Sequence, residues 1–236
     1  ISDDMGNAAL DPVLRPYGRA NWQVIAIRTC ARHHVALATL DHEQRKHERD
    51  DFVLRIEPQY GNIRRYVEAA QERRPSEFEL YLETRLNGGN GEASWLDDFP
   101  FYAVIRMTEV VGAVAVFGPR VQFNKLDEDG WWRAGAEGFE ILQQGEAGVQ
   151  AVLDDLRRAN PNRGRDWALK MVFGRLYDWL NYETNDPVFD PLRDIVRRYA
   201  VENLPLGPGD EVLGEEVTTR RLHSVYSASR SYDLHP

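Results

Sequence analysis

The feature that most constrains the fold is the repeated spacing of apolar residues by three and four positions along the chain. Such spacing places those residues on one face of an α-helix. Four segments carry one such apolar stripe each. A further segment, residues 101–114, carries two stripes and predicts a helix buried on two sides at the centre of its domain. The chain is therefore predicted to be mainly α-helical. The four singly striped segments are Phe78, Tyr81, Leu82 and Leu86; Val149, Val152, Leu153 and Leu156; Phe173, Leu176, Tyr177 and Leu180; and Leu192, Ile195, Val196 and Tyr199.

Local signals at the ends of these segments predict where the helices begin and end. Ser76 precedes the first striped segment as a capping residue, and a glycine-rich stretch at 87–91 follows it. Asp97 and Asp98 are predicted in the first turn of the central helix, where carboxylates favour the helix dipole. Gly118 and the proline after it are expected to end that helix.

The first fifty residues contain few periodic signals. The β-branched run Trp22–Ile27 predicts one strand of a small, loop-rich unit. The expected organisation is an N-terminal unit at 1–51, a first helical domain at 52–133 and a second helical domain at 134–236. Both helical domains are expected to be bundles that resemble helix-turn-helix units.

Composition sets limits on partners and location. Hydrophobic residues make up 42% of the 236 residues, which is usual for a folded protein. Because no apolar run approaches the roughly 20 residues that span a bilayer, no membrane association is expected and the chain is interpreted as cytoplasmic. The net charge of -9 means that any contact with DNA must be local. Most paired arginines, such as Arg157 with Arg158 and Arg197 with Arg198, are interpreted as solvated helix faces.

Motifs for catalysis are missing from the sequence. It contains no Walker lysine in a glycine-rich loop, no nucleophile elbow and no second cysteine for a redox pair. The segment 135–138, Gly-Ala-Glu-Gly, is too short for a dinucleotide fingerprint and is predicted to be a turn at a helix start. Asp154 and Asp155 occupy divergent helix positions and do not converge on one substrate atom. No catalytic residue is therefore predicted.

Cys30 and His33 form the one motif with metal chemistry. A tight turn at the end of a strand would let the thiolate and the imidazole bind the same Zn²⁺ at about 2.0 to 2.3 Å. Zinc takes four ligands, however, and this sequence has no other cysteine, so His34 or His42 would have to complete the set. The alternative interpretation is a partly buried thiol beside a surface histidine.

The run from Tyr17 to Leu37, which includes the Trp22 segment and Cys30-Ala31-Arg32-His33, resembles the middle of a TniQ-family zinc ribbon. In that family a Cys-x-x-Cys pair comes first and a Cys-x-x-His pair closes the site. Residues 1–4 resemble the segment just after the first pair. The resemblance thus implies that the intact protein binds one zinc through an upstream cysteine pair with Cys30 and His33. The sequence as given is expected to bind no stoichiometric zinc.

The resemblance extends over nearly the whole chain. Segments 95–114, 138–142 and 173–180 are similar to the helical units of the same family. Residues 217–226 and 233–236 resemble the first helix and turn of a helix-turn-helix, cut before its recognition helix. Arg220 and Arg221 are the residues predicted to contact nucleic acid there. A plain C-terminal helix that packs on the core is an equal alternative.

The resemblance implies a non-enzymatic adaptor for selecting transposition targets. Such an adaptor links target DNA, directly or through a targeting complex, to an AAA+ transposition ATPase, and a homodimer is among the arrangements considered. The alternative is a stand-alone helical DNA-binding regulator unrelated to transposition. A hydrolase without a recognised motif is a third, less favoured interpretation.

Overall fold

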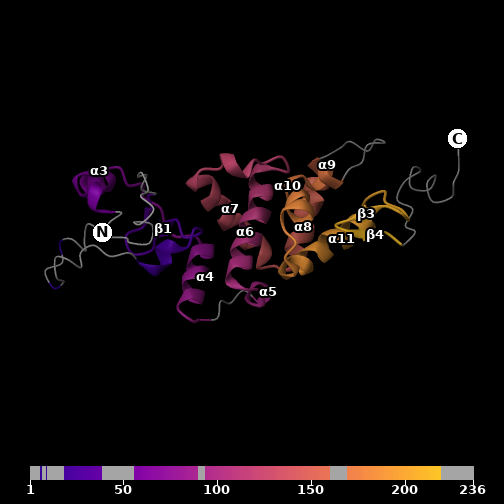
Figure 1. Cartoon of the computed structure of the whole chain (residues 1–236), viewed down its shortest axis with the longest axis horizontal. Coiled ribbons are helices and arrows are strands. Elements are labelled where there is room, and N and C mark those ends of the chain that lie inside the picture. The colour runs from indigo at the N-terminus through magenta and orange to yellow at the C-terminus, as the bar shows by residue number, and fades with distance from the viewer. Residues whose placement is uncertain are drawn as a thin grey trace. The chain divides into compact units, whose positions relative to one another are not determined.

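The computed structural model describes residues 6, 9, 19–38, 56–89, 94–159 and 169–218, and it is mainly helical (Figure 1). Helices account for 64% of the described residues, which contain nine α-helices and two small two-stranded sheets. The chain divides into two compact units, residues 1–89 and 90–236. The prediction of a mainly helical fold is thus confirmed.

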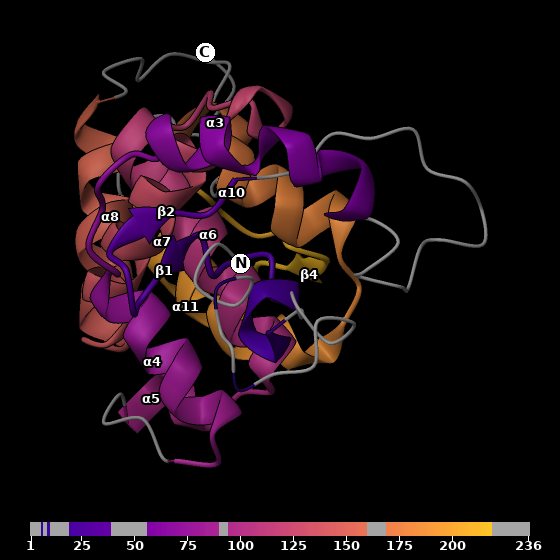
Figure 2. The same cartoon turned by 90° about the vertical axis from the view of Figure 1, so that its left-hand side faces the viewer.

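The first unit consists of short elements. A β-hairpin and the helix α4 are its best-defined parts, and β1 and β2 lie side by side in Figure 2. The elements in chain order are the 3₁₀ helix η2 (Ala20–Gln23), β1 (Thr29–Cys30), β2 (Val35–Ala36), the 3₁₀ helix η3 (Glu57–Asn62), α3 (Ile63–Glu68) and α4 (Glu77–Leu86).

The predicted strand over Trp22–Ile27 is wrong. Its first residues belong to η2, and the N–H of Ile27 then donates to the carbonyl of Val24 at 2.9 Å, which closes a turn. Ile25 is 75% exposed, whereas Ile27 is buried. The strand itself begins only at Thr29.

The predicted helix after Ser76 is confirmed as α4. The Ser76 hydroxyl accepts from the N–H of Glu79, and the Glu79 carboxylate accepts from the N–H of Ser76, so a complete capping box begins the helix. Phe78, Tyr81 and Leu82 are buried as the spacing predicts, while Leu86 is exposed.

The second unit contains the larger core. Its elements are α5 (Ser94–Asp97), α6 (Phe101–Phe117), the 3₁₀ helix η4 (Phe123–Lys125), α7 (Glu128–Leu142), α8 (Glu146–Ala159), α9 (Leu169–Phe173), α10 (Arg175–Asp178), the π-helix η5 (Trp179–Glu183), the 3₁₀ helix η6 (Pro187–Phe189), α11 (Asp190–Asn203), β3 (Glu211–Val212) and β4 (Glu215–Glu216).

Helix α6 is the central helix, as predicted. Residues 107–114 are all buried, and the helix packs against α7, α10 and η6. It ends at Gly118, whose φ of 85° suits a residue without a side chain. Asp97 and Asp98, however, lie in and just after α5, so their predicted place in the first turn of α6 is wrong.

Glycines allow α6 and α7 to cross closely. A Cβ atom on Gly112 would lie 1.8 Å from the carbonyl oxygen of Ala134, and one on Gly138 would lie 1.9 Å from that of Thr108. Gly138 and its neighbour Gly135 are therefore in the middle of α7, not in a turn at a helix start as predicted. The small size of Gly112 and Gly138 serves helix packing.

The stripe from Phe173 to Leu180 is buried as predicted, but it does not form one continuous helix. Gly174 has a φ of 52° and separates α9 from α10. A Cβ on Gly174 would lie 2.0 Å from the carbonyl oxygen of Pro119, so the backbone of the α6–α7 connection occupies that space. The predicted helices at α8 and α11 are confirmed, with their stripes buried.

The two compact units divide the chain differently from the expected domains. The expected division between residues 51 and 52 lies outside the described residues. The expected division between residues 133 and 134 falls within α7, which packs along α6. None of the described helices is both long enough and apolar enough to cross a membrane.

Candidate metal-binding knuckle

The turn between β1 and β2 brings Cys30 and His33 together. The N–H groups of His33 and His34 both donate to the carbonyl of Cys30, at 3.2 and 2.8 Å. His34 adopts a φ of 52°, which lets the chain reverse within four residues. As a result the Sγ atom of Cys30 lies 3.3 Å from Nδ1 of His33.

This separation suits two ligands of one zinc ion. Tetrahedral zinc with ordinary Zn–S and Zn–N bonds separates the two donor atoms by about 3.5 Å. The observed 3.3 Å requires only a small adjustment. Cys30 is buried and His33 is exposed, so the pair lies at the surface of the first unit with its thiol inside. The turn Cys30–His33, called the knuckle below, therefore places the thiol and the imidazole as close together as predicted.

Arg73, which precedes α4, and Glu79, which lies in α4, hold the knuckle in place. The Arg73 guanidinium donates to the carbonyl of Arg28 at 2.7 Å and to the hydroxyl of Thr29 at 3.2 Å. The Glu79 carboxylate accepts from the N–H of Arg28 at 2.8 Å. Sequence reasoning missed these supports.

The backbone next to Arg73 also extends the hairpin. The N–H of Ala36 donates to the carbonyl of Gln71 at 2.9 Å, and the N–H of Arg73 donates to the carbonyl of His34 at 2.8 Å. Val35 and Glu72 form an isolated antiparallel bridge. The turn that carries His33 is thus held by hydrogen bonds on both of its sides. These bonds limit how far the Cys30 thiol and the His33 imidazole can separate.

The knuckle supplies two donors in the part of the chain that the structure describes. No group of three or more His, Cys, Asp or Glu side chains there is placed to hold a metal ion. His42, considered as a further ligand, lies outside the described residues, as do Arg220 and Arg221 and the segment expected to resemble a helix-turn-helix. Cys30 and His33 therefore fit half of a zinc site.

The carboxylates of Asp154 and Asp155 diverge, as predicted. Asp155 pairs with Arg158, while Asp154 accepts a 2.5 Å hydrogen bond from the Tyr199 hydroxyl and pairs with Arg157. Asp154 is half-buried and links α8 to α11, so it is not simply a solvated charge. The Tyr199 hydrogen bond is the main cause that lowers the pKa of Asp154. Burial, followed by this hydrogen bond, raises the pKa of Tyr199 to about 12.

The raised pKa of Tyr199 predicts a specific alkaline sensitivity. An unfolded tyrosine titrates near pH 10, so the stabilisation by Tyr199 is complete below about pH 10 and is lost as pH rises through about 12. Between pH 9 and pH 11.5 the urea midpoint of the natural chain should fall further than that of Tyr199→Phe, which has no group to ionise. Equal falls in the two proteins would contradict the prediction.

No family model, curated protein or solved structure matches the chain.

Proposed function

We propose that the chain is a non-enzymatic adaptor of the TniQ kind, in which Cys30 and His33 close a zinc ribbon. The single observation that carries the proposal is the 3.3 Å approach of the Cys30 thiol to the His33 imidazole in a turn bonded on both sides. Cys and His are the usual ligands of closed structural zinc sites, and the family resemblance supplies a Cys-x-x-Cys pair for the other two positions.

The proposed role is to link target DNA or a targeting complex to an AAA+ transposition ATPase. The resemblance of residues 17–37 and of the helical segments suggests this role, with helix-turn-helix-like bundles providing the contact surfaces. The mainly helical fold agrees with such bundles in its secondary structure. In this proposal the zinc ribbon orders the first unit, and contacts with partners are made by helices and by local arginines.

Zinc content tests the metal part of the proposal. A chain that carries the Cys-x-x-Cys pair which the resemblance places ahead of Ile1 should bind one zinc, while the sequence as given should bind it weakly because it offers two donors. Cys30→Ser should lower the zinc content of the longer chain to near zero. His34→Asn is the matched control, since His34 is the exposed neighbour of the pair, and it should keep the zinc.

Cobalt replaces zinc in such sites and gives absorption bands for thiolate coordination, so titration with Co²⁺ provides a second measurement. Unchanged metal content after Cys30→Ser would overturn the zinc assignment. Gel filtration with an AAA+ transposition ATPase tests the adaptor role separately. DNA binding without ATPase binding would instead favour the stand-alone regulator.

A further inference from the structure

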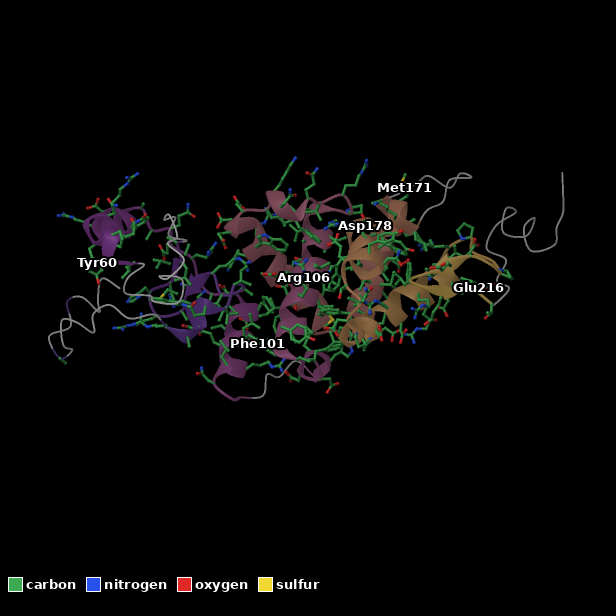
Figure 3. The ribbon with its side chains drawn as sticks, in the orientation of Figure 1. Tyr60, Phe101, Arg106, Met171, Asp178 and Glu216 are labelled. Atoms are coloured by element: carbon green, nitrogen blue, oxygen red, sulfur yellow. The ribbon has the colours of Figure 1, made fainter. Side chains whose placement is uncertain are left out.

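Four basic side chains of the second unit lie on α6, on α7 or in the connection between them. They are Arg106 on α6, Arg120 and Lys125 in the connection, and Arg133 on α7 (Figure 3 labels Arg106). Within the described residues none of the four forms an ion pair or a hydrogen bond through its side chain. Arg106 is half-buried, and the other three are exposed.

All other described lysines and arginines of this unit are ion-paired. Arg193 and Arg197, for example, pair with Asp190 and Asp194 on the same helix. The remaining pairs are Arg157 with Asp154, Arg158 with Asp155, Lys170 with Asp178, Arg175 with Glu183 and Arg198 with Glu146. In the described part of this unit, the cations without a carboxylate partner are therefore those on α6, on α7 and in the connection between them, although the chain as a whole is acidic.

Aromatic rings fix the orientation of two of these guanidinium groups. The guanidinium carbon of Arg106 lies 5.7 Å from the ring centre of Phe123 and 6.0 Å from that of Trp179. That of Arg133 lies 5.2 Å from the ring centre of Phe117. A guanidinium that rests on a ring keeps its N–H donors at its edge, where they can form paired hydrogen bonds with an oxyanion.

Carboxylates on η5 and on α7 lie near this region. Arg175, whose guanidinium carbon is 4.7 Å from the ring centre of the same Phe123, pairs with Glu183 on η5. Asp127 accepts from the N–H of Gly130 at 2.8 Å and is the cap of the helix. Glu128 and Asp129 also have partners. Glu137 is exposed one turn beyond Arg133 without pairing with it. These acids limit the net charge of the region but do not neutralise the four cations directly.

We propose that Arg106, Arg120, Lys125 and Arg133 form a contact surface for the phosphate backbone of nucleic acid. Phosphates accept paired hydrogen bonds from guanidinium edges, and such contacts are independent of base sequence. The inference deepens the proposed function and rests on it for the choice of nucleic acid over an acidic protein. It names four cations in addition to the predicted contact residues Arg220 and Arg221.

The test measures duplex DNA binding by the full chain across a salt series. Four phosphate contacts predict that log K falls with log salt at a slope of about -3 to -4. Arg120→Gln with Arg133→Gln should make the slope shallower by about two and weaken binding about 60-fold at 0.1 M salt. The matched control, Arg158→Gln with Arg198→Gln, removes the same charge from two exposed, ion-paired sites and should change the slope by less than one.

Thermal melting checks that each variant is folded. Arg120→Gln with Lys125→Gln serves as the second variant, because neither side chain has a hydrogen-bond or ion-pair partner among the described residues, and the same weakening is expected. Unchanged binding in both variants, or equal weakening in the control, would overturn the surface. Poly-glutamate that competes as well as DNA at equal charge would overturn the nucleic-acid assignment.

Two further results separate this surface from the proposed function. No binding of duplex DNA by the chain at low salt would overturn the surface and leave the zinc and ATPase experiments to decide the adaptor role. Loss of binding in Arg220→Ala with Arg221→Ala, but not in the Arg120 variants, would place the DNA contact at the C-terminal segment and overturn the inference.

Discussion

A Gly112→Val variant is expected to lose about 3 kcal/mol of its free energy of unfolding, because α6 and α7 cannot separate without loss of their contact. Any Cβ on Gly112 would lie 1.8 Å from the carbonyl oxygen of Ala134 and 2.6 Å from the amide nitrogen of Gly138. Both atoms belong to the α7 backbone, so a side-chain rotation cannot relieve the overlap. Urea unfolding followed by tryptophan fluorescence measures the loss.

Gly112→Ala gives the sharper version of this test. In an ordinary helix, alanine stabilises by about 1 kcal/mol relative to glycine, whereas at this crossing it should destabilise. Gly61→Ala is the control, since a Cβ there has no neighbour within 4 Å. A Gly112→Ala protein that is as stable as the natural chain would show that the crossing can widen at little cost. The same variant should also disturb DNA binding, because the α6–α7 connection carries the basic side chains.

Helices that bury a single regular stripe could be predicted from the sequence. In α8 and α11 the apolar spacing, the flanking breaks and the burial agree, because each helix packs one face on the core and exposes the other. The capping box at Ser76 likewise located the start of α4. These features depend on residues within a few positions of one another, which is the information that a local pattern contains.

Features that depend on distant backbone could not be predicted in the same way. Gly174 interrupts its helix because the carbonyl of Pro119, more than fifty positions earlier, occupies the space for a side chain. Gly135 and Gly138 were interpreted as a turn because nothing nearby in the sequence indicates that α6 crosses there. The strand expected at Trp22–Ile27 failed for a related reason, since tertiary packing overrides β-propensity in short segments.

The candidate sites show the same division. The two-residue spacing of Cys30 and His33 predicts their approach, but not the support from Arg73 and Glu79. Adjacent arginine pairs are conspicuous in the sequence, yet Arg157, Arg158, Arg197 and Arg198 all have carboxylate partners. In the described part of the second unit, the cations without a carboxylate partner are isolated in sequence, so only the three-dimensional structure identifies them.

Arg193→Met is expected to cost about 3 to 5 kcal/mol of the free energy of unfolding. The Arg193 guanidinium is buried on α11 and donates to the carbonyls of Leu180, Thr184 and Asp186 at 3.1, 2.5 and 3.0 Å, and to the carboxylate of Asp190 at 2.6 Å. These carbonyls belong to η5 and the segment after it. Methionine keeps the apolar stem and removes every donor, which leaves one buried and two half-buried carbonyls without these hydrogen bonds.

Arg198→Met is the matched control for this prediction. It makes the same substitution on the same helix, so the change in helix propensity cancels, but Arg198 is exposed and pairs only with Glu146. A surface pair of this kind contributes less than about 1 kcal/mol. Arg193→Lys should remain close to Arg193→Met, because one ammonium group cannot reach three carbonyls in different directions. If the lysine variant retains full stability, charge alone holds this turn, and the donor geometry of the guanidinium is not what stabilises η5.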